Sequence, residues 1–415
     1  MGLWLLLLAT ALAAVPGIAL RILGVHPAAP VGALVFGGTI LAAAFILSWA
    51  AETAEMDISQ GLALAVIAFI AVLPEYAVDL VLAWKAGADP AEAERGLAIA
   101  NMTGGNRLLI GVGWPVVFFL FWLRTRSRTL AVDTHRAIEL TFLLVATAYV
   151  MTVPIRDVLT LADSIILVTL FVIYLYYTSK AEAEEVELVG PARAVGSLTT
   201  LRRRIVLLLL LVYSAAAIMS SAEPFAESLV EMGEQLGVSE FVLIQWLAPL
   251  ASESPEVLVA ALLAWRGRAA VGMGALISSK VNQWTLLVGT LPIAFSIAAG
   301  HFELFGGLPL DHRQREEIFL TAAQSAFAIA VFANLRMGMW EATALFVLFA
   351  TQLFLTDERV RLVYSVAYLL LCAFLLASRW REAKPTARAA WAILRGREPE
   401  AVHREAIAPQ PPAID

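Results

Sequence analysis

The amino-acid sequence predicts an all-α integral membrane protein with about 12 transmembrane helices, arranged as two inverted five-helix repeats plus one extra helix at each end. The first observation is composition: 60% of the 415 residues are hydrophobic and only 15% are charged, and mean hydropathy is +0.78. The second is that about twelve segments approach or exceed the roughly 20 apolar residues needed to cross a bilayer. The third is that two of these segments carry a matching Pro-Glu step, at Pro74-Glu75 and Pro255-Glu256.

The first half of the chain contains six of these apolar segments. The earliest, residues 2–22, lacks the basic start of a secretory signal peptide, and we interpret it as an uncleaved helix. The next five helices are expected at residues 31–50, 62–84, 97–123, 137–153 and 158–177.

The second half follows a polar stretch, residues 179–204, that begins with acidic residues and ends in Arg202-Arg203-Arg204. Its six helices are expected at residues 205–219, 241–265, 271–299, 318–333, 340–355 and 360–376. The tail from residue 379 is charged and rich in proline near its end, which is typical of disorder.

The two halves correspond as helices two to six and helices seven to eleven. Because five is an odd number, the second half must enter the membrane from the opposite side, so the repeats are inverted. The predicted division is an extra N-terminal helix (1–30), a first repeat (31–178), a cytoplasmic linker (179–204), a second repeat (205–356), an extra C-terminal helix (357–378) and a disordered cytoplasmic tail (379–415).

Basic residues in short loops set the orientation, because such loops stay on the cytoplasmic side. With both termini cytoplasmic, most of these residues fall on that side: Arg124, Arg126, Arg128, Arg136, Arg202, Arg203, Arg204, Arg266, Arg268, Arg336 and the Arg-rich tail. Four others, Arg313, Arg315, Arg359 and Arg361, then face outward.

The two Pro-Glu steps are the strongest functional signal in the sequence. Glu75 stands nine residues before Trp84-Lys85, and Glu256 stands nine residues before Trp265-Arg266. A carboxylate at membrane depth costs several kcal/mol unless it is paired, hydrated or bound to a cation. The neighbouring proline removes a backbone donor and exposes carbonyl oxygens that can bind ions. Two such elements in two halves are the expected trace of a transporter with a site near the midplane.

Two carboxylates of this kind can share a cation and can also take up protons. Hard cations require several oxygen ligands, and neighbouring carboxylates favour each other's protonation when no cation is present. Competition between a cation and protons for the same pair is sufficient to couple two fluxes. The alternative is a pair of structural acids buried against arginine or lysine, which a symmetric pair beside proline disfavours.

The segments around these glutamates resemble the calcium/cation antiporter superfamily, which includes the sodium/calcium exchangers. Its two inverted repeats read G-T-S-L-P-E and then G-N-x-x-G-S-N-x-x-N. The corresponding segments here are Ala71-Val72-Leu73-Pro74-Glu75, Ser252-Glu253-Ser254-Pro255-Glu256, Asn101-Met102-Thr103-Gly104-Gly105-Asn106-Arg107 and Ser278-Ser279-Lys280-Val281-Asn282-Gln283. The resemblance covers roughly residues 31–356.

The resemblance implies a set of ion-binding residues. Glu75 and Glu256 are carried over as cation ligands; Ser252, Ser279 and Gln283 are carried over as further ligands, and Asn101 and Asn106 without fixed roles. Departures from the pattern concern ligand positions: Ala71 and Val72 replace two hydroxyl residues, and Lys280 replaces an asparagine.

Four charged residues can tune the charge of this site. Asp79 lies one helical turn after Glu75, and Glu253 lies three residues before Glu256. They either enlarge the acidic cavity or are neutralised, Asp79 by Arg107 and Glu253 by Lys280. A lysine here can take the place of a monovalent cation, so the ion stoichiometry of typical sodium/calcium exchangers does not transfer.

Small residues in the same helices allow two interpretations. Gly104-Gly105 and Ser278-Ser279 either permit close packing of helices or expose carbonyl oxygens to an ion.

The sequence therefore predicts a secondary active cation antiporter that moves Ca2+ or Na+ across the membrane in exchange for Na+ or H+ by alternating access. The nearest alternative is a Na+/H+ antiporter that does not transport calcium. Alternatives of another class are an intramembrane acid/base enzyme, which lacks a recognisable nucleophile, and a scaffold that has lost transport.

The expected partners are the lipid bilayer and inorganic cations, and the oligomeric state is left open. No cofactor is expected, and a single cysteine and five histidines without metal-ligand spacing argue against a zinc enzyme. No pattern of basic and aromatic residues suggests nucleic-acid binding. Composition predicts a multi-pass protein of the plasma membrane, the inner membrane of a bacterium.

Overall fold

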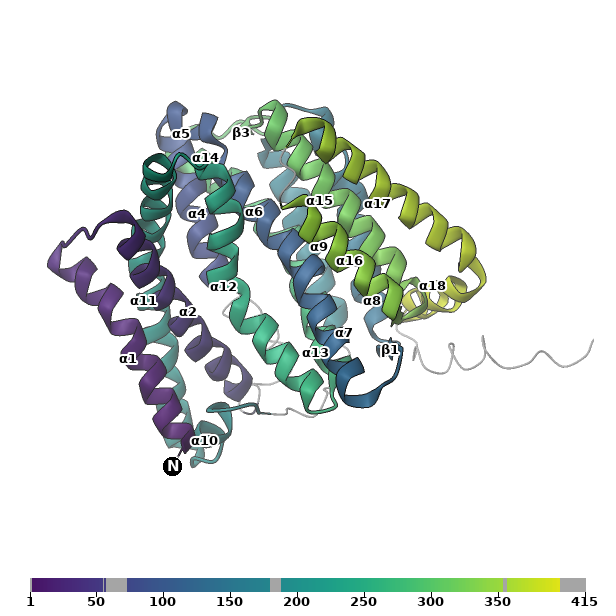
Figure 1. Cartoon of the computed structure of the whole chain (residues 1–415), viewed down its shortest axis with the longest axis horizontal. Helices are drawn as coiled ribbons and strands as arrows, with labels where there is room; N and C mark the ends of the chain where they lie inside the picture. Colours follow the sequence, from purple (N-terminus) through teal and green to yellow (C-terminus); the bar gives the residue numbers. More distant parts are fainter. Residues whose placement is uncertain (1, 55, 57–72, 180–187, 354–356, 396–415) are drawn as a thin grey trace, which may run out of the picture.

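A computed structural model of the chain describes residues 2–54, 56, 73–179, 188–353 and 357–395. This part is almost entirely helical (Figure 1). In the first half the elements are α1 (Gly2–Leu23), α2 (Ala29–Ala54), α4 (Leu73–Ala88), α5 (Pro90–Arg95), α6 (Leu97–Leu108), the π-helical turn η1 (Leu109–Gly113), α7 (Trp114–Thr125), β1 (Thr129–Ala131), α8 (Arg136–Val150), η2 (Val153–Ile155), β2 (Val158–Thr160) and α9 (Leu161–Thr178).

The second half repeats this order of elements. They are α10 (Ala192–Gly196), α11 (Thr200–Leu236), α12 (Glu240–Trp265), α13 (Ala269–Asn282), the π-helical turn η3 (Gln283–Leu287), α14 (Val288–Ala299), β3 (Gly307–Pro309), α15 (His312–Val331), η4 (Phe332–Asn334), β4 (Arg336–Gly338), α16 (Met339–Gln352), α17 (Glu358–Ser378) and α18 (Trp380–Leu394).

Nine helical stretches in the described ranges are long and apolar enough to cross a membrane, and the bent helix α12 makes ten. Its parts, Glu240–Ser254 and Glu256–Trp265, meet at an angle of 53°. The bend falls at Pro255, which has no N–H donor to continue the helical hydrogen bonds. The shorter helices α4 and α16 stand where the sequence predicts helices three and eleven; residues 57–72 of the third predicted helix lie outside the described residues.

Two small antiparallel sheets confirm that the halves are related by inversion. One pairs β1 with β4, and the other pairs β2 with β3. Counting helices within each repeat, β1 corresponds to β3 and β2 corresponds to β4, so each sheet is the counterpart of the other. Figure 1 places β1 and β3 at opposite ends of the bundle, as a twofold axis in the membrane plane requires.

The centre of the molecule is formed by helices of both repeats. The long helices α2 and α11 pack side by side, α12 packs against α6, and α14 packs against α4 (Figure 1). One apolar core runs through these contacts. The Pro-Glu segment of each repeat therefore lies on a helix that packs against the other repeat as well as against its own.

Helix α11 is longer than predicted. The sequence places helix seven at residues 205–219, followed by an acidic stretch, but α11 runs from Thr200 to Leu236. Two of its acidic residues form ion pairs with other helices: Glu223 binds Arg21 at 2.8 Å, and Glu227 binds Lys85 at 2.7 Å. The predicted linker likewise contains the short helix α10.

The prediction of a disordered tail from residue 379 is wrong for residues 380–394, which form α18. Ala389 and Ala390 on its buried face pack against Ala137 at the start of α8. Charge and proline content suggest disorder, but small alanines allow the helix to lie close to the bundle. Residues 396–415 lie outside the described residues.

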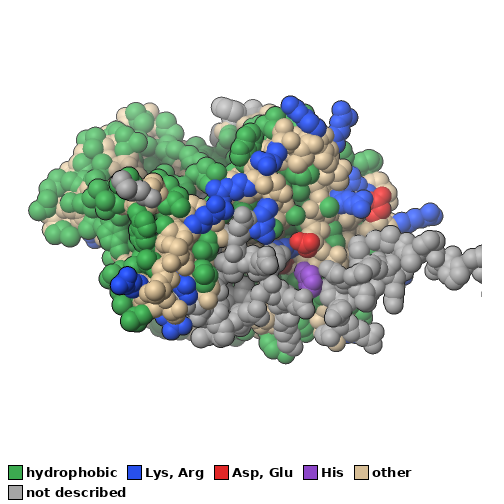
Figure 2. Space-filling view, turned by 90° about the horizontal axis from the view of Figure 1, so that it is seen from below, with side chains coloured by type: hydrophobic (Ala, Val, Ile, Leu, Met, Phe, Trp, Pro, Cys, Tyr) green, Lys and Arg blue, Asp and Glu red, His purple; other side chains and the backbone are tan. Residues whose placement is uncertain are grey.

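Basic side chains gather on one end of the bundle. Figure 2 shows this face, the lower one in Figure 1, with many Lys and Arg side chains across it. The strand β1, which directly follows Arg128, pairs with β4, which begins at Arg336. Arg124 donates a hydrogen bond to the carbonyl oxygen of Trp265, the residue before Arg266. These loops are the ones that the sequence assigns to the cytoplasmic side.

Candidate functional site

The candidate site lies where α4 and α6 of the first repeat meet α12 and α13 of the second. Glu75 is in the first turn of α4 and is 5% exposed. Glu253 precedes the bend in α12 and is 2% exposed, whereas Glu256 follows the bend and is partly buried. All three carboxylates are close enough for electrostatic interaction with one another. The inverted arrangement thus collects acids from both halves.

Oxygens of two of these acids lie close to Gly105 on α6. A methyl group on Gly105 would stand 2.2 Å from Oε1 of Glu253 and 3.6 Å from Oε1 of Glu75. Two carboxylate oxygens therefore approach the same point, and only a residue without a side chain leaves room for them. Opposing helices thus bring Glu75 and Glu253 into one cavity.

Several oxygens in this cavity are buried without a partner. Within the described residues, Oε1 of Glu75, both side-chain oxygens of Glu253 and Oδ2 of Asp79 accept no hydrogen bond of good geometry. Buried carboxylate oxygens without donors are costly. A bound cation or protons would compensate this cost.

In the first repeat, both predicted asparagines are hydrogen-bonded within the protein. Asn101 donates from Nδ2 to Oδ1 of Asp79 at 3.0 Å. Asn106 donates from Nδ2 to the carbonyl oxygen of Met102 at 2.8 Å. Asn101 therefore orients Asp79 beside Glu75, while Asn106 keeps only its side-chain oxygen for other partners.

In the second repeat, two predicted ligands hold glutamates in place. Ser279 Oγ donates to Oε2 of Glu256 at 2.6 Å, and Gln283 Nε2 donates to Oε2 of Glu75 at 3.2 Å. Ser252 instead donates to the carbonyl oxygen of Ala248 in its own helix at 3.2 Å. Ser279 and Gln283 thus belong to the acidic cluster, and the hydroxyl of Ser252 is engaged elsewhere.

Lys280 is fully buried and forms no direct ion pair within the described residues. Its Nζ donates to the side-chain oxygen of Asn106 and, at 3.3 Å, to the carbonyl oxygen of Asn106. The same Nζ lies 4.4 Å from the ring centre of Trp284. Lys280 interacts electrostatically with Glu253 and Glu75 without forming an ion pair with either, so the predicted neutralisation of Glu253 by Lys280 acts at longer range.

Arg107 is bound by a different acid from the one predicted. Its Nη2 lies 2.6 Å from Oε2 of Glu317, and its guanidinium group lies 5.0 Å from the ring centre of Trp246. Gln245 also donates to Glu317, at 3.0 Å. The alternative in which Arg107 neutralises Asp79 is therefore wrong, because α15 supplies the counter-charge.

The charge balance of the cavity follows from these contacts. Glu75, Asp79, Glu253 and Glu256 contribute four carboxyl groups, and Lys280 contributes one ammonium group. When all are ionised the excess is three negative charges, which is too many for a membrane interior without bound cations. The arrangement can hold a divalent cation or exchange that cation for protons.

The remaining predictions concern Gly104 and the two residues that replace hydroxyl ligands. Gly104 is a packing residue, since a methyl group there would stand 1.8 Å from the backbone oxygen of Gln245. Ala71 and Val72, which replace hydroxyl ligands, lie outside the described residues.

Each repeat also has a π-helical turn at the end of the helix that carries its site residues. In the first repeat η1 follows α6, and in the second repeat η3 begins at Gln283 itself. Such turns widen a helix and are frequent at functional sites. Sequence reasoning missed these turns, as well as the contact of Lys280 with Trp284 and the hydrogen bond of 3.1 Å from Tyr76 to Asn282.

The chain is similar to three solved structures of cation exchangers. The crystal structure of the H+/Ca2+ exchanger CAX is 42% identical, with a TM-score of 0.90, over 95% of this chain and 99% of that chain. YfkE is 17% identical, with a TM-score of 0.61, over 88% of this chain and 99% of that chain. The sodium-calcium exchanger NCX_Mj is 19% identical, with a TM-score of 0.52, over 78% of this chain and 97% of that chain; these last two likenesses concern the fold alone.

A family model supports the same assignment. The model described as sodium/calcium exchanger protein matches residues 28–180 and 206–357, one match in each half. A comparison with curated protein sequences finds no match. The two matches coincide with the two inverted repeats, so the chain belongs to the sodium/calcium exchanger protein family of membrane cation antiporters.

Proposed function

We propose that the protein exchanges Ca2+ for H+ by alternating access at the acidic cavity between the two repeats. One observation carries the proposal: Glu75 and Glu253 place oxygens without hydrogen-bond partners of good geometry near the same point beside Gly105. Ca2+ takes six to eight oxygen ligands and favours carboxylates. Such buried carboxylates also bind protons when the cation leaves. The 42% identity to a structure named H+/Ca2+ exchanger supports this choice of ions.

Two polar residues that could contribute to additional Na+ sites form hydrogen bonds within the protein. Ser252 is bonded to its own helix, and the side-chain oxygen of Asn106 accepts from Lys280. Lys280 places a tethered positive charge beside the acids, where a further monovalent cation would otherwise bind. The charge of Lys280 and its hydrogen bond to the Asn106 oxygen favour protons over several Na+ ions as the counter-substrate.

Transport then follows from competition within one cavity. Ca2+ binding displaces protons from the acids, and protons entering from the opposite side displace Ca2+. The inverted repeats supply two equivalent conformations that open the cavity to one side or the other. We propose inorganic cations as the substrates, with no catalytic chemistry, and place the protein in the plasma membrane of a bacterial cell.

The test is uptake of radioactive Ca2+ into proteoliposomes under an imposed pH gradient or an imposed Na+ gradient. We expect uptake driven by the pH gradient, its loss in Glu75→Gln, and its persistence in the exposed control variant Glu303→Gln. Uptake driven by Na+ alone would reject proton coupling. Proton-driven Na+ movement without Ca2+ movement would instead establish the Na+/H+ alternative.

A further inference from the structure

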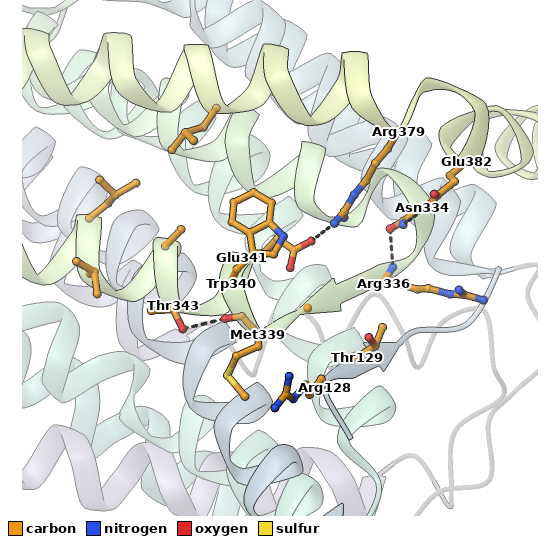
Figure 3. Close-up of a pocket in the computed structure, with 15 residues that line it drawn as sticks. Arg128, Thr129, Asn334, Arg336, Met339, Trp340, Glu341, Thr343, Arg379 and Glu382 are labelled. Carbon is orange, nitrogen blue, oxygen red and sulfur yellow. Dashed lines mark hydrogen bonds and ion pairs between the residues drawn. The ribbon is translucent and has the colours of Figure 1, made fainter. Parts of the chain in front are cut away.

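A large groove lies far from the acidic cavity, at the basic end of the bundle. It has a volume of about 1020 Å³ and is bordered by β1, β4, α16 and the adjoining ends of α17 and α18 (Figure 3). β1 belongs to the first repeat and β4 to the second, so the groove crosses the joint between them. Neither the acidic cluster nor the proposed ion path uses these residues.

One part of the groove is apolar. Ala344, Val347 and Leu348 lie on one face of α16, and Leu371 on α17 stands opposite. Val347 is 47% exposed, and Ala344, Leu348 and Leu371 are partly exposed. Because α16 and α17 belong to the transmembrane bundle, the apolar part of the groove opens to lipid tails.

The other end of the groove is basic. Figure 3 shows Arg128, Arg336 and Arg379 around this end, with Trp340 beside them. Arg379 is paired with Glu341, while the side chains of Arg128 and Arg336 have no acidic partner among the described residues. The second acid of the groove, Glu382, accepts a hydrogen bond of 2.8 Å from Asn334. Two exposed guanidinium groups without an acidic partner in the described part of the chain therefore remain at the basic end of the groove, beside its apolar part.

Helix α18 lies beside the basic end of the groove and indicates its depth in the membrane. It is amphipathic, with a small-residue face on the bundle and the exposed basic residues Arg381, Lys384 and Arg388 on the other side. Trp380 and Trp391, near its two ends, are 62% and 56% exposed. Helices with basic and tryptophan residues on their exposed face lie in the interface of a membrane. The mouth of the groove thus stands at the level of lipid head groups.

We propose that this groove binds one anionic phospholipid of the leaflet on the basic side. The exposed side chains of Arg128 and Arg336 bind the phosphate group, and one acyl chain follows Ala344, Val347, Leu348 and Leu371. Arginine matches phosphate geometry through paired N–H donors. A lipid with a net negative charge is favoured over a zwitterionic one, because two unpaired arginines face the phosphate. Bound lipid would also brace β1 against β4.

The test measures lipid binding and does not depend on the transported ion. The full-length protein is purified in an uncharged detergent, and its thermal unfolding midpoint is followed while phosphatidylglycerol or phosphatidylcholine with identical chains is added. We expect stabilisation by phosphatidylglycerol at concentrations at least roughly 10-fold lower than those needed for phosphatidylcholine.

Two pairs of variants locate the site. In Arg128→Gln/Arg336→Gln we expect roughly 30-fold weaker binding of phosphatidylglycerol, since each basic residue near an anionic membrane surface contributes about fivefold. The control Arg202→Gln/Arg266→Gln removes two exposed arginines of the same end outside the groove and retains binding. Val347→Trp should fill the apolar part of the groove and weaken binding. Phe346→Trp, on the same helix but outside the groove, should not.

Several results would overturn the proposal. Equal stabilisation by phosphatidylcholine would show that head-group charge is irrelevant. Full binding in Arg128→Gln/Arg336→Gln would place the lipid elsewhere. Stabilisation by inorganic phosphate or glycerol phosphate alone, to the same extent, would show an anion site without an acyl chain. Each of these results leaves cation exchange itself untouched.

Discussion

Replacing Gly105 by alanine tests the geometry of the acidic cavity with one methyl group. The new carbon would stand 2.2 Å from Oε1 of Glu253, whereas ordinary contacts begin at 3.4 Å. The carboxylate must therefore retreat by about 1 Å, which exceeds the roughly 0.5 Å that a preorganised site tolerates. Because this oxygen is at the end of a flexible side chain, the helices themselves need not move.

The expected result is weaker Ca2+ binding in a protein that remains folded. Displacing one carboxylate ligand should weaken binding roughly 10- to 100-fold, the usual effect of disturbing the surroundings of a metal site. Alanine also gains about 1 kcal/mol over glycine in a helix interior, so the thermal unfolding midpoint without Ca2+ should not fall.

Two neighbouring glycines supply controls for this variant. In Gly113→Ala the nearest atom is a methyl carbon of Val257 at 3.3 Å, so Ca2+ binding should be retained. In Gly104→Ala the methyl group meets the backbone oxygen of Gln245 at 1.8 Å, so the protein should lose stability. Isothermal titration and thermal unfolding of the three variants separate these effects. Unchanged Ca2+ affinity in folded Gly105→Ala would refute the shared cavity.

Three further predictions concern the surroundings of the cavity. Lys280→Met removes the tethered ammonium group, so each cycle should carry an additional monovalent cation; a shifted reversal potential in proteoliposomes would show it, and an unchanged one would deny Lys280 this role. Ser279→Ala removes the 2.6 Å hydrogen bond to Glu256 and should shift the pH dependence of Ca2+ uptake towards higher pH, because the ionised form loses a donor; an unshifted profile contradicts this. Glu317→Gln leaves Arg107 buried without its partner and should cost about 3–5 kcal/mol of stability, whereas Arg107→Met/Glu317→Met should recover most of it; thermal unfolding compares the two.

The sequence predicts the architecture well because its signals are local and repeated. Apolar segments of membrane length and the Pro-Glu step in each half are sufficient to predict the helices and their inversion. The ends of α11 and the existence of α18 were mispredicted for one reason. Glu223 and Ala389 are judged by composition as loop or disordered residues, but they lie in helices and contact residues distant in sequence, Arg21 and Ala137.

The site is only partly predictable from sequence. Glu75, Ser279 and Gln283 are found from their motifs, because each motif is contiguous. The partner of Arg107 could not be found, since Glu317 is on α15 and no spacing rule connects the two. Similarly, sequence motifs cannot show that Glu75 and Glu253 both approach Gly105, because the contact joins helices of opposite repeats.

The most direct test of a shared acidic site is to count the protons released when Ca2+ binds. Titration of the purified protein in two buffers of different ionisation enthalpy gives this number. We expect protons to be released on Ca2+ binding, and fewer of them in Glu253→Gln. Ca2+ binding without proton release, or with the same release in Glu253→Gln, would contradict competition between Ca2+ and protons at these carboxylates.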